Sequence, residues 1–187
     1  MKTFIALTFI GILTYANAQL VLINECKPVT PMEGFKATDF FTGKWYVTQV
    51  KYGFLEVCEA FNASKTDDGK YVTEVKYNVD EEEIQVRCEA TGEENSPKLS
   101  FNCTKTGNDD FQREFIVLGT DYNDYAVIYR CDKMKEGSLL LDNYVVVSRK
   151  SDNKEIPEPA KNLTAALGLK KCGEKPLLMF LEKTTTF

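Results

Sequence analysis

The sequence predicts an all-β protein: an eight-stranded antiparallel up-and-down barrel with a C-terminal helix and a short tail. Three observations lead to this prediction. From residue 44 onward, short runs of β-forming residues alternate with turn residues such as those at 67–69. No helical pattern interrupts these runs before residue 150. Consecutive antiparallel strands close naturally into a barrel, because closure removes both sheet edges and leaves an interior for one small ligand.

Residues 1–18 have the pattern of a secretory signal peptide. Lys2 precedes an apolar run over residues 4–13, and residues 16–18 form an A-x-A cleavage site. The run is too short to span a bilayer. We expect cleavage after Ala18, so that residues 19–187 form a single domain that is secreted and extracellular.

An irregular arm and eight strands are expected after this leader. Prolines and a glycine within residues 19–39 predict the arm, with one helical turn before the first strand. Gly43 permits a sharp entry into that strand, where Trp45 and Tyr46 stand on opposite faces. Glycine- and aspartate-containing turns separate most of the later strands. The predicted strands cover residues 44–52, 57–64, 70–79, 84–90, 98–105, 111–118, 124–131 and 139–149.

The chain changes character after the last predicted strand. Pro157 and Pro159 introduce a helical pattern over residues 160–167, and Gly168 suits the end of that helix. The apolar run 176–181 predicts an added strand that lies on the barrel.

The composition excludes several classes of function. A net charge of −5 without a basic cluster argues against nucleic acids and membranes as partners. Histidine is absent, which removes the usual general base, haem ligand and zinc ligand. Catalysis by serine–histidine or cysteine–histidine pairs is therefore excluded. We expect no enzyme, no metal and no cofactor.

Six cysteines in an exported chain predict three disulfides. Cys88 and Cys103 flank the loop between the fourth and fifth predicted strands, and a hairpin there places them opposite each other. N-x-S/T triplets begin at Asn62, Asn102 and Asn162. We expect glycosylation at Asn62 and Asn162, whereas Cys103 inside its triplet makes Asn102 a weaker candidate.

Three short motifs lie at related places in the predicted barrel. Gly43-Lys44-Trp45 opens the first strand, Thr120-Asp121-Tyr122 lies between the sixth and seventh, and Arg149 closes the eighth. This set resembles the conserved motifs of the lipocalins, whose arginine packs over the tryptophan at the closed end. Such a contact gains roughly 1–2 kcal/mol of cation–π energy when it is sheltered from water.

Longer stretches narrow the resemblance. Residues 41–48, 76–78 and 126–131 are similar to the salivary lipocalins of blood-feeding triatomine bugs. That group includes the nitrophorins, triabin, pallidipin and platelet-aggregation inhibitors. The resemblance covers nearly all of the mature chain.

The resemblance also implies the other two disulfides. Cys26 is expected to pair with Cys131, and Cys58 with Cys172, which fastens both terminal segments to the barrel. Closing loops of about 100 residues stabilises the folded state by on the order of 5 kcal/mol each in the chain-entropy account.

Members of this group act outside the cell on host haemostasis. They deliver nitric oxide from haem, sequester ADP, amines or eicosanoids, or inhibit proteases through the protein surface. The match of residues 76–78 puts Lys76 where nitrophorins carry the haem-ligating histidine. A lysine ammonium cannot ligate iron without losing its proton, so we expect no haem. The resemblance implies a monomeric binder of a small-molecule host mediator.

Lys76 is the first candidate for a ligand pocket. If the register of the resemblance holds, its ammonium points into the barrel, with Glu74 and Asn78 on the same face. A phosphate or carboxylate ligand can then partner the buried lysine, or Lys76 pairs with Glu74 or faces solvent instead. Further candidates on the sixth, seventh and eighth predicted strands are Arg113, Tyr129, Arg130 and Asn143.

The loops at the predicted mouth favour the opposite ligand charge. These loops carry more acidic than basic residues and would form an acidic rim around the mouth. An acidic rim attracts cationic amines and slows the approach of nucleotides, unless it is simply a solvated set of loops. The sequence therefore leaves the charge of the ligand open. The rim residues are Glu56, Asp80, Glu81, Glu82, Glu83, Asp109 and Asp110, against Lys133 and Lys135.

Three hypotheses follow. The first is a secreted protein that sequesters ADP, a biogenic amine or an eicosanoid and so inhibits platelet aggregation or vasoconstriction. The second is a surface-directed inhibitor of a clotting protease or platelet receptor, whose interior is filled by side chains. The third, an enzyme with a carboxylate pair, is the least favoured, because the chain has no histidine and no glycine loop for phosphate.

Overall fold

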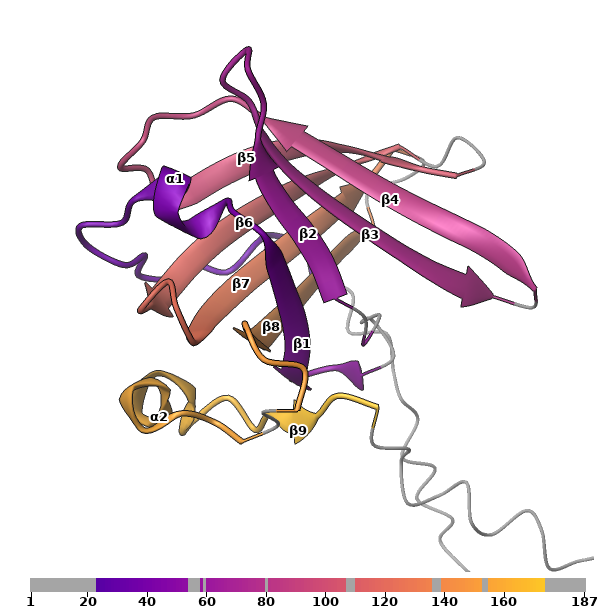
Figure 1. Ribbon diagram of the computed structural model, residues 1–187. Helices are drawn as coiled ribbons and strands as arrows, with labels where there is room; N and C mark the ends of the chain where they lie inside the picture. The colour runs from indigo at the N-terminus through magenta and orange to yellow at the C-terminus, as the bar shows by residue number, and fades with distance from the viewer. Residues whose placement is uncertain are drawn as a thin grey trace, which may run out of the picture.

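The chain forms the predicted barrel. The structure, a computed structural model, describes residues 23–53, 58, 60–79, 81–106, 110–135, 139–152 and 155–173. Within these ranges the strands are β1 Lys44–Val50, β2 Ala60–Lys65, β3 Tyr71–Val79, β4 Glu82–Ala90, β5 Lys98–Lys105, β6 Phe111–Thr120, β7 Tyr125–Met134 and β8 Leu140–Ser148. Each pairs antiparallel with the next, and β1 closes the sheet by pairing with both β2 and β8 (Figure 1).

Two short helices and one short strand complete the described fold. The predicted helical turn is α1, Ala37–Phe40, and the predicted C-terminal helix is α2, Glu158–Thr164. The strand β9, Lys170–Lys171, adds to the edge of β1, whereas the predicted strand at 176–181 and the leader at 1–18 lie outside the described residues. No helix in the described part of the chain is long and apolar enough to cross a membrane.

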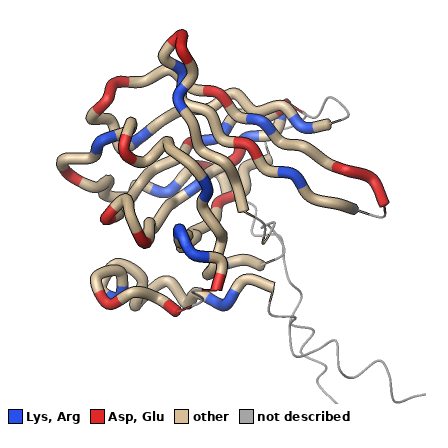
Figure 2. Tube along the Cα trace, in the orientation of Figure 1, with Lys and Arg blue, Asp and Glu red and all other residues tan. Residues whose placement is uncertain are grey.

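The strand boundaries differ most from the predicted ones in β7. This strand continues to Met134 because Asp132 and Lys133 still pair with β6 on one side and β8 on the other. The hairpin of β3 and β4 is also tighter than predicted, since Glu82 and Glu83 already belong to β4. Charged residues line this hairpin, with acidic residues at its turn (Figure 2).

Aromatic side chains fill the closed end of the barrel. Alternation along each strand sends every second side chain into the interior. Phe40 of α1 stacks on Trp45 with ring centroids 5.1 Å apart, and Phe41 lies 4.9 Å from Tyr71. Phe101 is also buried here, at 1% exposure. The helical turn α1 and the residues after it therefore act as a plug.

A second apolar layer lies outside the barrel wall. Tyr129 and Tyr144 stand on the outer face of β7 and β8, with ring centroids 5.0 Å apart. The N-terminal arm covers them, and α2 covers the neighbouring part of the same face. These strands are therefore buried on both faces.

The disulfides have the expected pairing. Cys88 and Cys103 face each other directly across β4 and β5, as the predicted hairpin requires. The backbone N–H of Cys172 also donates to the Thr48 carbonyl at 2.9 Å, which holds the C-terminal segment on β1. The three bonds are Cys26–Cys131, Cys58–Cys172 and Cys88–Cys103.

Arg149 closes the barrel over Trp45. The guanidinium carbon lies 3.6 Å from the centroid of the indole ring. Its nitrogens donate to the carbonyl oxygens of Tyr122 at 3.1 Å, Lys44 at 3.2 Å and Phe40 at 3.3 Å. Burial lowers the pKa of Arg149, but an arginine remains protonated at neutral pH. The three sequence motifs therefore meet at one contact.

The turn between β6 and β7 holds the backbone of Tyr122 in place for this contact. The Thr120 hydroxyl donates to the Tyr125 carbonyl at 2.6 Å and accepts from the Tyr122 N–H at 2.9 Å. One oxygen of Asp121 accepts the amides of residues 123–125 at 2.9–3.2 Å. The Thr-Asp-Tyr motif is thus a turn-forming unit.

Glu94, in the β4–β5 loop, ties that loop to α1. Its carboxylate accepts the Thr38 N–H at 2.7 Å and the Thr38 hydroxyl, and the Tyr71 hydroxyl at 3.0 Å. Burial of the Glu94 carboxyl raises its pKa, but these hydrogen bonds, together with Lys65 at 3.5 Å, outweigh burial and lower the pKa to about 2.

Arg149→Met removes the cation–π contact and the hydrogen bonds of the guanidinium to the carbonyl oxygens of Phe40, Thr42, Lys44 and Tyr122. We expect the free energy of unfolding to fall by about 3 kcal/mol. Urea denaturation with intact disulfides measures this loss. The matched control is Lys150→Met, an exposed ion-pair partner of Asp124, which we expect to change stability by less than about 0.5 kcal/mol. Equal effects of the two substitutions contradict the role given to Arg149.

The low pKa of Glu94 makes its contribution to stability depend on pH. Because the folded-state pKa lies below the ordinary value of 4.5, the contribution is complete above about pH 5 and disappears as the pH falls toward 2. We expect Glu94→Gln to lose less stability than the natural protein between these pH values. Urea midpoints measured from pH 6 to pH 2 check this, and parallel curves contradict it.

Candidate functional site

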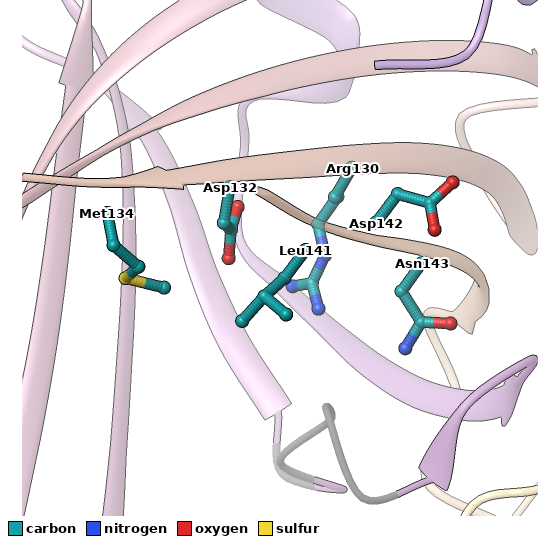
Figure 3. Close-up of a pocket in the computed structure, with 6 residues that line it drawn as sticks. All are labelled: Arg130, Asp132, Met134, Leu141, Asp142 and Asn143. Atoms are coloured by element: carbon teal, nitrogen blue, oxygen red, sulfur yellow. The ribbon is translucent and has the colours of Figure 1, made fainter. Parts of the chain in front are cut away.

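Polar side chains gather in the half of the barrel interior that lies away from Trp45. Arg113 of β6 is paired with Asp132 of β7, and Arg130 of β7 is paired with Asn143 of β8. Alternation places all four on the interior face. Figure 3 shows Arg130, Asp132 and Asn143 pointing to the same side of the sheet. Three predicted candidates, Arg113, Arg130 and Asn143, are therefore brought together.

Arg113 and Asp132 form a two-pronged ion pair. Arg113 Nε donates to Oδ1 and Nη2 donates to Oδ2, each at 2.7 Å, and the side chains are 14% and 18% exposed. Burial lowers the pKa of Arg113, but the charge and hydrogen bonds of Asp132 outweigh it and raise the pKa. Both oxygens of Asp132 are occupied by this pair. A second sheltered carboxylate, that of Asp142, also borders the cavity described next, and it is paired with Lys27.

Arg130 lines a cavity with a volume of about 120 Å³. Burial lowers the pKa of Arg130, and the charge of Asp132 opposes this shift. The cavity holds about four waters at the volume that each takes up in the liquid, and sites for whole drug-sized ligands measure about 300–1,000 Å³. It therefore suits one charged group of a ligand. Its lining residues are Arg130, Asp132, Met134, Leu141, Asp142 and Asn143 (Figure 3).

Asn143 lines this cavity, but the backbone of Tyr52 already uses the hydrogen-bonding groups of its side-chain amide. The Tyr52 N–H donates to Asn143 Oδ1 at 3.0 Å, and Asn143 Nδ2 donates to the Tyr52 carbonyl at 3.1 Å. The next backbone bond, from Lys51 N–H to the Tyr144 carbonyl, is 3.0 Å long. The predicted ligand contact through the Asn143 amide is therefore replaced by a positioning role for the segment that follows β1.

The opposite wall of the barrel is apolar at this level. β3 and β4 present the pairs Val75–Val86 and Tyr77–Ile84. Val75, Tyr77 and Ile84 are only partly buried, although they pack against the core. The interior above the aromatic plug is thus polar along β6 to β8 and apolar along β3 and β4.

The predicted interior position of Lys76 and Glu74 is wrong. Lys76 is 58% exposed on the outer face of β3, and its Nζ lies 3.3 Å from Glu83 Oε1. Glu74 pairs with Arg87 on the same outer face. A shift of one residue in register exchanges the two faces of a strand. In β3 the side chains that face the interior are those of the alternate residues, which include Val75 and Tyr77.

Tyr129 is also misplaced by the prediction. It lies on the outer face of β7, where its hydroxyl accepts the Lys27 N–H at 2.7 Å. Burial raises the pKa of this phenol. The neighbouring carboxylate, Asp142, is 1% exposed and lies 2.6 Å from Lys27 Nζ. Lys27 and Tyr129 fasten the N-terminal arm and do not reach the interior, whereas Asp142 also borders the Arg130 cavity.

Sequence analysis missed two residues of this site. Asp132 has an interior position because it lies two residues after Arg130, a spacing that the sequence already contains. Tyr52 contributes to the site through its backbone, which is hydrogen-bonded to Asn143, and no sequence signal predicts this contact. Among the described residues no group of acidic or cysteine side chains is arranged to hold a metal ion.

The predicted acidic rim is only partly within the described residues. Glu81, Glu82 and Glu83 are exposed at the β3–β4 turn, and Asp110 pairs with Lys135. Glu56, Asp80 and Asp109 lie outside the described residues. The asparagines of the N-x-S/T triplets, Asn62, Asn102 and Asn162, are exposed, and glycosylation of Asn62 and Asn162 stays a prediction.

Comparison with known proteins identifies the family. The sequence profile of the Triabin family matches residues 20–162. Procalin of Hospesneotomae protracta is 38% identical over 92% of this chain and 100% of its own length. The structure of LTBP1 in complex with LTC4 has a TM-score of 0.62 at 26% identity, covering 83% of this chain and 99% of that one. The tryptamine complex of the amine-binding protein of Rhodnius prolixus has a TM-score of 0.61 at 23% identity, covering 87% and 96%. The chain belongs to the triabin family of triatomine salivary lipocalins.

Proposed function

We propose that this protein, secreted after cleavage at Ala18, sequesters a small host mediator that carries one anionic group on an apolar body. An eicosanoid acid has this chemistry, and its removal would inhibit platelet aggregation or vasoconstriction. Lipocalins of the triabin family are binding proteins without enzymatic activity, and the family includes platelet-aggregation inhibitors. The barrel interior supports this choice among the possible ligands.

The charge of the interior carries the proposal. A cationic amine needs a carboxylate partner, but both oxygens of Asp132 already accept hydrogen bonds from Arg113, and Asp142 is already paired with Lys27. Arg130 lines the cavity with its guanidinium, which can bind a carboxylate through two parallel hydrogen bonds. The electrostatics of the described interior therefore favour an anion over an amine.

The apolar wall favours a lipid acid over ADP. Val75, Tyr77 and Ile84 offer apolar surface across the barrel from Arg130. A nucleoside diphosphate has several charges and a polar ribose, and this apolar wall offers them no hydrogen-bonding groups. The LTBP1 structure, at 26% identity, contains LTC4, which is leukotriene C4.

A second candidate function rests on the aromatic plug. Phe40, Phe41, Trp45 and Phe101 fill the closed half of the barrel, so that part holds no ligand. A protein that inhibits a clotting protease or platelet receptor through its outer surface needs no cavity. Prolonged clotting in a plasma assay, unchanged by Arg130→Met, favours this second function.

Arg130→Met tests the anion site through a lipid acid and its methyl ester. The natural protein should bind the acid of a stable thromboxane analogue with about 1:1 stoichiometry. It should prefer the acid over the ester by about 10-fold or more, because one charge-assisted hydrogen bond contributes about 1.5–3 kcal/mol. In Arg130→Met this preference should disappear. Titration calorimetry measures all four affinities.

Lys76→Met is the matched control for this test, because it removes a cation from the outer face. Its acid and ester affinities should equal those of the natural protein. Binding of serotonin in place of the acid contradicts the proposal. An acid–ester preference that survives Arg130→Met contradicts the assignment of the site.

Asn143→Ala tests the positioning role of the amide. Loss of its two hydrogen bonds releases the backbone of Tyr52 from the cavity wall. We expect the affinities for the acid and the ester to fall by a similar factor, about 5-fold, with the preference between them retained. Faster hydrogen exchange at the Tyr52 amide should accompany this loss. A selective loss of acid binding contradicts the positioning role.

A further inference from the structure

A polar groove lies at the open end of β5, β6 and β7, separate from the lining of the Arg130 cavity except for Met134. Its volume is about 440 Å³. Asn102 and Thr104, the two recognition residues of an N-x-T triplet, lie in its lining. The other lining residues are Cys103, Asp110, Phe111, Gln112, Lys133, Met134 and Lys135.

Strand alternation separates the triplet from the disulfide inside it. Asn102 and Thr104 are exposed on the outer face of β5. Cys103, between them, is 2% exposed and faces the interior, where it is bonded to Cys88. The disulfide and the Asn102 amide therefore lie on opposite sides of the sheet. The sequence-based objection to Asn102 does not hold in the folded chain.

The surroundings of Asn102 suit a sugar ring. Gln112 lies directly opposite Asn102 on β6, and Lys133 lies opposite Gln112 on β7. An amide and an ammonium supply donors and an acceptor for hydroxyl and acetamide groups. Asn62, by contrast, lies between Lys44 and Glu74 on the outer face of the sheet and is not part of this groove.

We propose that Asn102 carries an N-linked glycan and that its first N-acetylglucosamine lies in this groove. In the reaction, Asn102 Nδ2 forms a bond to the anomeric carbon of a lipid-linked oligosaccharide. The bond from that carbon to the lipid diphosphate breaks, the diphosphate leaves, and the transferase takes the amide proton. The step requires passage through a eukaryotic secretory pathway, and it occurs before β5 is folded.

Peptide mapping tests the modification. The full chain is expressed in insect cells, and the secreted, disulfide-bonded protein is treated with peptide N-glycosidase F in heavy-oxygen water. Reduction and trypsin then release residues 99–105. We expect Asn102 in this peptide to be converted to heavy-oxygen-labelled aspartate. Thr104→Ser should retain the label, and Thr104→Val, which keeps the asparagine, should lose it. An unlabelled peptide from the natural protein overturns the proposal.

The position of the sugar in the groove needs a second measurement. Glycans trimmed to one N-acetylglucosamine are examined by nuclear Overhauser effects from the acetyl methyl group. We expect contacts with the side chains of Gln112 and Lys133, and their loss in Gln112→Ala. A single sugar on Asn62, which lies outside this groove, serves as the control. Contacts with Asn102 alone overturn the placement in the groove.

Discussion

The contact of Arg149 with Trp45 is the constraint on which the rest of the barrel depends. The guanidinium lies 3.6 Å from the indole centroid and donates to backbone carbonyls before, within and across from β1. One charged group thereby joins α1, β1, the β6–β7 turn and the end of β8. Because this end is closed by packed aromatic rings, space for a ligand is left only toward the other end. The position of the cavity is a consequence of the plug.

Arg113 and Arg130 lie in the half of the barrel interior away from Trp45. Two arginines are unusual in an interior that only stabilises the fold. A charge removed from water requires a partner, and apolar residues of similar size often give equal or greater stability. Asp132 forms the two-pronged pair with Arg113, and Arg130 lines the cavity beside this pair. The proposed anion would add a negative charge next to the Arg130 guanidinium.

The fold was predictable because its signals are local. Strand alternation, turn residues and the position of Cys88 and Cys103 around one loop are all present in the sequence. The site was predictable only in part. Arg113 and Arg130 follow from alternation, but Lys76 was placed from a three-residue match, in which a shift of one residue exchanges interior and exterior. Tyr129 is buried on the outer face because the N-terminal arm covers it, and the sequence does not specify the path of that arm.

The same alternation explains how one barrel can serve ligands of different charge. On β7, Arg130 and Asp132 face the interior, while Tyr129 and Cys131 face the arm. Each substitution on the interior face changes the ligand chemistry and leaves the arm, the disulfides and the Arg149 contact unaltered. A family built on this fold can therefore change ligands through a few positions on β6, β7 and β8. For this reason family membership alone does not identify the ligand of this chain.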